Sequence, residues 1–295
     1  MPDITLLPAN LTALILESCL YGILLLLFLS TISVLATRRT MAVAGDNRAK
    51  RRDFTSRVFL GVAGLFIIIT VHWGIVIYRA FFAFTQLGNA TSEFGFYGDP
   101  TQPSEVAELI LFFAAVLVGD ALIIHRLWII WGGNRYVMIV PICSLVGAFV
   151  TAFGTIYVGV RFPPGARPYL FGIVTKPWTG AACLCSFLTM IYSTAFIVIR
   201  ISRAADKTAP DSRLMSFLAI LVESAALQAL WLAFTAATIF TTSDVEIIAA
   251  ETFPAVIGIS NLLILARVSL GWSQGSTTPP TTQPTSWRRS TEDAV

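Results

Sequence analysis

Charged residues are scarce in this sequence. Asp, Glu, Lys and Arg together make up 13% of the 295 residues, whereas hydrophobic residues make up 56%. A soluble domain usually carries about 25% charged residues. The composition therefore excludes an ordinary soluble domain and predicts a chain whose main solvent is lipid.

Lysine, histidine and cysteine are also rare. The three lysines, Lys50, Lys176 and Lys207, lie in loops or at the edges of apolar runs, which excludes a retinal Schiff base inside a helix bundle. Two histidines are too few for two bis-histidine haems or for a multi-histidine zinc or di-iron site. The four cysteines lie inside apolar segments, as small buried apolar residues do. We therefore expect no metal site and no cofactor.

Motifs of common enzyme classes are missing as well. The sequence has no glycine-rich phosphate-binding loop, and Gly258-Ile259-Ser260 lacks the second glycine of a nucleophile elbow. We therefore expect neither an enzyme nor a nucleic-acid partner.

Long apolar runs dominate what the sequence does contain. A membrane-spanning helix needs about 20 apolar residues, and seven runs reach that length. They cover residues 12–36, 57–84, 105–131, 136–160, 177–201, 214–240 and 246–270. The runs predict an all-α, polytopic membrane protein with a single seven-helix domain at residues 1–270. Residues 271–295 are rich in Ser, Thr and Pro, which predicts a disordered tail.

The basic residues predict the orientation in the membrane. The loop at 38–56 is strongly basic, whereas the loop at 85–104 contains no Lys or Arg. Because Lys and Arg accumulate in cytoplasmic loops, we expect the N-terminus outside and the C-terminus in the cytoplasm. The first residues carry no basic region and no cleavage site, so the first run is expected to remain as a spanning helix.

Polar residues inside the runs are the candidates for function, because ionisable groups deep in a membrane are costly. Asp120 and Glu223 lie nearest the midplane, and Asp120 needs a partner on another helix. Polar residues of the sixth run form a stripe at helical spacing, and the seventh run has a similar stripe. The predicted internal polar network or ligand site consists of Asp120, Glu223, Gln228, Asn261 and Ser224. The simpler alternative is that these stripes only join helices by hydrogen bonds.

Other ionisable residues lie nearer the helix ends. Arg126, Arg200 and Arg267 fall at the cytoplasmic ends of their runs, where a long side chain can reach the membrane surface. For Arg126, pairing inside the bundle is an equal alternative. His125, His72 and Glu17 are further ionisable groups within the runs.

The tail contains one candidate modification site. Arg288 and Arg289 precede Ser290 and Thr291, a pattern that basophilic kinases phosphorylate. A disordered cytoplasmic tail would be accessible to such a kinase.

Five segments carry a family resemblance. They are ESCLYG at 17–22, VHWGIVIYRAFFAF at 71–84, GDALIIHRLWIIWGGN at 119–134, ESAALQALW at 223–231 and FPAVIGISNLLILARVSLGW at 253–272. As a set they resemble a large family of mostly uncharacterised seven-helix membrane proteins of mushroom-forming (basidiomycete) fungi. The resemblance covers almost the whole chain except the tail and implies the fold but no activity. That family usually has Tyr before the third-helix Arg, where this chain has His125.

The similarity to G-protein-coupled receptors is one of topology only. The third run ends in His125-Arg126-Leu127 instead of Asp-Arg-Tyr, and the seventh lacks Asn-Pro-x-x-Tyr after Asn261.

Three hypotheses for function remain open. The leading one is a receptor-like sensor of the plasma membrane, in which a polar interior that opens outward binds a small ligand and a basic cytoplasmic face contacts a signalling protein. The second is a small-solute or proton-coupled transporter, in which Asp120 and Glu223 would titrate. The third is a structural or accessory subunit whose partner is membrane lipid. An internal membrane is the alternative location.

Asn89-Ala90-Thr91 is a glycosylation sequon in the loop expected outside. We predict that Asn89 carries a glycan, so enzymatic deglycosylation should increase the gel mobility of the wild-type protein. The Asn89→Gln variant should already migrate at the deglycosylated position. Asn10 begins a second sequon close to the membrane and provides the control: Asn10→Gln should leave the mobility unchanged. A glycan shift that persists in Asn89→Gln would contradict the prediction.

Overall fold

The computed structural model describes residues 6–41, 49–86, 95–99, 101–162, 168–205, 212–241 and 245–271. Within these ranges the chain forms seven long helices with membrane-spanning length and hydropathy. They are α1 (Leu6–Met41), α2 (Ala49–Gln86), α4 (Pro103–Ile130), α5 (Arg135–Arg161), α6 (Pro168–Ala205), α7 (Ser212–Thr241) and α8 (Val245–Gly271). The prediction of an all-α, seven-helix membrane protein is confirmed. Asn89 and residues 272–295, with Ser290 and Thr291, lie outside the described residues, whereas Gly271, the first residue of the predicted tail, still belongs to α8.

Several helices are longer than the apolar runs that predicted them. The basic loop expected at 38–56 is shorter, because α1 continues to Met41 and α2 begins at Ala49. Ala, Lys and Arg favour helix, and charged side chains beyond the apolar core do not oppose a helix that continues into water. Hydropathy therefore located the part of each helix inside lipid and not its true ends.

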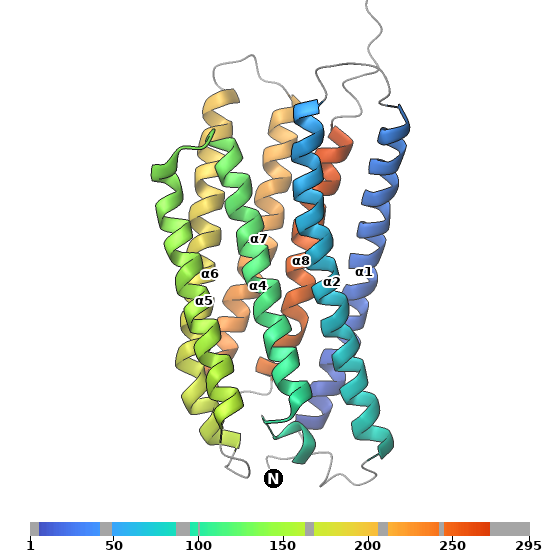
Figure 1. Cartoon of the computed structure of the whole chain (residues 1–295), viewed down its shortest axis with the longest axis vertical. Helices are drawn as coiled ribbons and strands as arrows, with labels where there is room; N and C mark the ends of the chain where they lie inside the picture. Colours follow the sequence, from blue (N-terminus) through green and yellow to red (C-terminus); the bar gives the residue numbers. More distant parts are fainter. Residues whose placement is uncertain are drawn as a thin grey trace, which may run out of the picture.

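Consecutive helices run in opposite directions (Figure 1). α1, α4, α6 and α8 begin at the same end of the bundle, which is called the N-terminal end below because α1 begins there. Helix α5 packs against α6, and α8 packs against α1, α2, α4 and α7. Many large apolar side chains, such as Leu26, Leu60 and Leu230, are exposed on the outside of the bundle, as lipid contact requires.

Helix α8 lies at the centre of this packing. Every residue from 252 to 262 is buried. Phe253, Ile257 and Leu262 belong to the largest apolar cluster of the described residues, together with side chains of α1, α2, α4, α6 and α7. Polar residues on α8 are therefore held inside the protein.

Aromatic residues fix α1 against α2. Tyr21 stacks on Trp73 with ring centroids 4.3 Å apart, and Phe28 stacks on Phe66 at 4.0 Å. The indole N–H of Trp73 also donates to Ser18 Oγ at 3.1 Å. These contacts hold the segment after residue 16 of α1 level with the segment around residue 72 of α2.

The α4–α5 connection is a tight turn built on two glycines. Gly132 and Gly133 have φ values of 60° and 82°, a region that residues with a side chain rarely adopt. The next residue, Asn134, caps α5 by accepting a hydrogen bond from the backbone N–H of Tyr136 at 3.1 Å. The turn returns the chain directly, so that α5 packs beside both α4 and α6.

Gly119 permits a close approach between α4 and α8. A β-carbon at this position would lie 2.6 Å from Cγ2 of Ile257, a side chain that is fully buried and β-branched. Such a side chain has little freedom to move aside. We therefore predict that Gly119→Val lowers the free energy of unfolding by about 1–3 kcal/mol.

The matched control is Gly64→Val, because a β-carbon at Gly64 on α2 meets no other described atom within 4 Å. Both substitutions have the same helix propensity, so the comparison isolates the contacts of residue 119 with α8, chiefly with Ile257. SDS titration in mixed micelles measures the two unfolding free energies. Equal losses in the two variants would contradict close α4–α8 packing at Gly119.

Candidate functional site

Asp120 lies fully buried in the middle of α4, as its predicted role requires. Ser186 of α6 donates a hydrogen bond to Asp120 Oδ1 at 3.0 Å. The second carboxylate oxygen, Oδ2, has no hydrogen-bond partner among the described residues. The expected partner on another helix is therefore a single hydroxyl.

A second group of polar residues surrounds a small cavity between α4, α6, α7 and α8, which we call the Arg126 cavity. Its polar lining consists of Arg126, Thr194, Ser224, Gln228, Ser260 and Asn261. The volume of about 20 Å³ is enough for one water molecule. The structure thus brings together three residues of the predicted network, Ser224, Gln228 and Asn261, whereas Asp120 is not among the lining residues.

Hydrogen bonds connect the helices around this cavity. Ser260 Oγ donates to Gln228 Oε1 at 2.8 Å and so joins α8 to α7. Arg126 Nη2 donates to the backbone carbonyl of Asn261 at 3.3 Å and joins α4 to α8. Within the described part of the chain, Arg126 Nη1 and Asn261 Oδ1 have no hydrogen-bond partner. Two polar atoms are thus available to a water molecule or a small ligand.

Of the three arginines predicted at cytoplasmic helix ends, the structure describes the side chains of two, and these two lie in different surroundings. Arg126 is buried and faces the cavity, so the interpretation that it reaches the membrane surface is wrong. Arg200 is exposed and its guanidinium lies 5.4 Å from the ring centroid of Trp131, a cation–π contact. The Arg267 side chain lies outside the described part of the structure.

The prediction that Glu223 belongs to the internal network is also wrong. Its side chain is exposed, whereas the next residue, Ser224, is buried. Neighbouring residues on a helix point about 100° apart, and the packing of α7 leaves Glu223 on the outward side. Other residues of the α7 stripe do join helices: the indole N–H of Trp231 donates to the Ala249 carbonyl on α8 at 3.2 Å.

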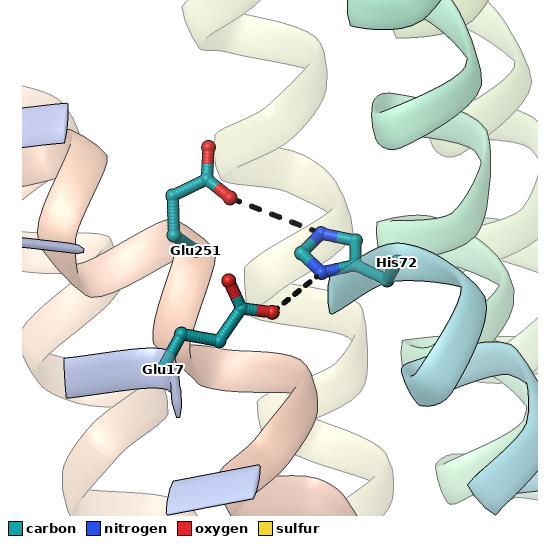
Figure 2. Close-up of side chains that lie close together, drawn as sticks. All are labelled: Glu17, His72 and Glu251. Carbon is teal, nitrogen blue, oxygen red and sulfur yellow. Dashed lines mark hydrogen bonds and ion pairs between the residues drawn. The ribbon is translucent and has the colours of Figure 1, made fainter. Parts of the chain in front are cut away.

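The most concentrated group of ionisable residues was not predicted as a site. Glu17 of α1, His72 of α2 and Glu251 of α8 meet between their helices (Figure 2), and we call them the Glu–His–Glu cluster. His72 Nδ1 lies 2.9 Å from Glu17 Oε1, and His72 Nε2 lies 4.0 Å from Glu251 Oε2. Glu17 and His72 are buried, and 16% of the Glu251 side chain is exposed.

A buried arginine continues this group towards the N-terminal end. Arg79 of α2 forms ion pairs with Glu105 and Glu108 of α4. Glu108 in turn lies beside Glu251. We call Arg79, Glu105 and Glu108 the Arg79 cluster.

Sequence patterns alone hardly predict these two clusters. Glu17 and His72 stand out as ionisable groups in apolar runs, but Arg79 and Glu108 read only as charges near the outer ends of their runs. Their partners lie on other helices, so no spacing within one run reveals the pairs. The available signal was the presence of opposite charges at similar depths in different runs.

Charge balance suggests what this region can do. The two clusters contain four carboxylates but only one arginine and one histidine. Buried charge in a membrane is costly unless it is neutralised. The region is therefore suited to hold a cation or protons. The Arg126 cavity, whose lining residues include an arginine and no carboxylate, is suited to an anion.

Comparison with known proteins found no similar protein. No family model matches the chain, and neither a curated protein nor a solved structure is significantly similar to it. The resemblance to the fungal seven-helix family therefore stays a prediction.

The Asp120–Ser186 hydrogen bond should stabilise the bundle measurably. In a double-mutant cycle of Asp120→Ala and Ser186→Ala, we predict a coupling free energy of about 0.5–2 kcal/mol. The reason is that Ser186 is the one described donor to this buried carboxyl group. Unfolding free energies of the wild type, both single variants and the double variant, measured by SDS titration, provide the value. Strictly additive effects would show that the two side chains do not interact.

Proposed function

We propose that this integral membrane protein is a receptor-like sensor. The proposal depends mainly on one observation: α8 contributes Glu251 to the Glu–His–Glu cluster and Asn261 to the Arg126 cavity. The two residues are ten positions apart, which corresponds to about 15 Å along a helix. A change in charge or occupancy at one cluster would therefore act on the same helix that forms the other.

The helix between these residues is suited to bend. Pro254 lies inside α8 and has no N–H to donate to the carbonyl of Ala250, which weakens the helix at this turn. Gly258 follows one turn later, where a β-carbon would lie 2.6 Å from Ile69 and 2.7 Å from Leu24. Small movements of α8 here would alter its contacts with α1 and α2, as a two-state switch requires.

The orientation predicted from the basic residues places the Glu–His–Glu cluster nearer the outside and the Arg126 cavity nearer the cytoplasm. In this arrangement an external ligand or ion acts at the first site, and a cytoplasmic signalling protein responds to the second. The plasma membrane is the location that such a role requires.

A proton-coupled or small-solute transporter is the second candidate. It is favoured by the spread of buried ionisable groups along the bundle, from the Arg79 cluster through His72 and Asp120 to Arg126. Chains of such groups are typical of proton pathways.

Proximity labelling from the C-terminus in the native cell tests the sensor proposal without a known ligand. We expect enrichment of heterotrimeric G-protein subunits or kinases. In Glu251→Gln this enrichment should change, because α8 would lose its carboxylate in the Glu–His–Glu cluster. Glu223→Gln is the matched control, since it removes an exposed carboxylate from the same bundle.

Two outcomes would count against the sensor. Enrichment of lipid- or wall-synthesis enzymes without signalling proteins would favour an accessory subunit. Proton or solute flux into proteoliposomes that is lost in Asp120→Asn would favour the transporter.

A further inference from the structure

We propose that Glu17, His72 and Glu251 bind a divalent transition-metal ion of the Zn²⁺ type. The inference does not depend on the sensor function, because metal binding can occur in a receptor, a transporter or a structural protein. It rests on the geometry, burial and charge of the cluster.

The donor atoms have the spacing of a metal site. One ligand atom from each of the three residues lies within 4.8 Å of the others. Zn²⁺ binds imidazole nitrogen and carboxylate oxygen at about 2.0–2.2 Å. The 4.0 Å between His72 Nε2 and Glu251 Oε2 is too long for a hydrogen bond and admits an ion between the two atoms.

Glu17 holds the histidine ring in place for this role. Its Oε1 lies 2.9 Å from Nδ1, whereas Glu251 lies towards the other ring nitrogen, Nε2. Metal-binding histidines commonly donate their second N–H to a carboxylate, which fixes the tautomer and the ring orientation. With Nδ1 protonated, Nε2 carries the lone pair that a metal ion requires. Figure 2 shows both carboxylates on the same side of the ring and directed towards it.

Burial provides the second, independent observation. Glu17 is 0% exposed, and its Oε2 has no hydrogen-bond partner among the described residues. The facing oxygen of Glu251, Oε2, is buried and unpartnered in the same sense. An unsatisfied carboxylate oxygen in such surroundings is costly, and coordination to a cation removes that cost.

The charges match a divalent ion. Arg79 binds Glu105 and Glu108, and Glu108 also lies beside Glu251. The four carboxylates of the two clusters therefore face one arginine and one histidine, and a divalent cation between His72 and Glu251 would reduce this excess of acidic groups. Protons held by the same groups are the competing occupant, a proton-only state without a metal ion.

The ligand set also selects the kind of metal. Imidazole together with carboxylate suits Zn²⁺ and neighbouring transition metals. Ca²⁺ and Mg²⁺ prefer oxygen ligands alone and a larger number of them. Towards the N-terminal end, the side chain of Glu105 is 35% exposed and that of Glu251 is 16% exposed.

Zn²⁺ itself is the probe. The full-length protein is purified in detergent, stripped with a chelator, exposed to Zn²⁺ and dialysed, and its metal content is measured by mass spectrometry. We expect about one Zn²⁺ per chain and no comparable retention of Ca²⁺ or Mg²⁺. In His72→Ala and in Glu251→Gln, the affinity should fall at least about tenfold.

Two variants serve as controls. His125→Ala removes the only other histidine, and Glu223→Gln removes an exposed carboxylate. Both should bind Zn²⁺ as the wild type does. Equal Zn²⁺ retention in His72→Ala and in the wild type would overturn the proposal. A folded wild-type protein that retains no Zn²⁺ would also overturn it, because the cluster would then hold only protons.

X-ray absorption of the Zn²⁺-loaded wild type decides the question even if the variants fail to fold. We expect scattering from one imidazole and from carboxylate oxygens at about 2.0–2.2 Å. A zinc environment without imidazole would overturn the proposal. Loss of signalling partners in the labelling experiment would contradict the sensor but leave this result unchanged.

Discussion

The cost of placing charge inside a lipid-embedded bundle constrains the rest of this structure. Helices satisfy their own backbone groups, but an ionisable side chain in a span must find its partner on another helix. Arg79 meets Glu105 and Glu108, His72 meets Glu17, and Asp120 meets Ser186. Each of these contacts joins two different spanning helices. The polar groups therefore specify how the helices align, while the apolar residues that face lipid tolerate many arrangements.

Helix α8 has the largest share in this alignment. It is buried along its middle and contacts α1, α2, α4 and α7. Its approach to α4 depends on the missing side chain at Gly119, and its approach to α1 and α2 depends on Gly258. Because α8 approaches its neighbours this closely at both glycines, a movement of α8 would change its contacts with α1, α2 and α4. This is the physical reason why a site at Glu251 and a site at Asn261 can be coupled through one helix.

Sequence reasoning predicted the buried polar residues better than it predicted their partners. Asp120, Ser224, Gln228 and Asn261 are buried, as expected for polar groups that lipid cannot satisfy. Glu223 was misplaced because helical periodicity defines relative directions around α7 but not which direction faces the bundle. Arg126 could not be placed from its position near a helix end, since the decision between membrane surface and interior depends on the cavity formed by α4, α6, α7 and α8.

The sequence by itself determined the solvent, the number of spans and the all-helical fold. These follow from the length and hydropathy of local runs, because a lipid-embedded backbone can satisfy its hydrogen bonds within one helix. Only the tertiary structure decided which face of each helix is internal and which ionisable groups meet. The Glu–His–Glu cluster draws on residues 17, 72 and 251, and its 2.9 Å and 4.0 Å contacts arise from the packing of α1, α2 and α8. That packing depends on side-chain shape across helices, which no periodicity within a single run records.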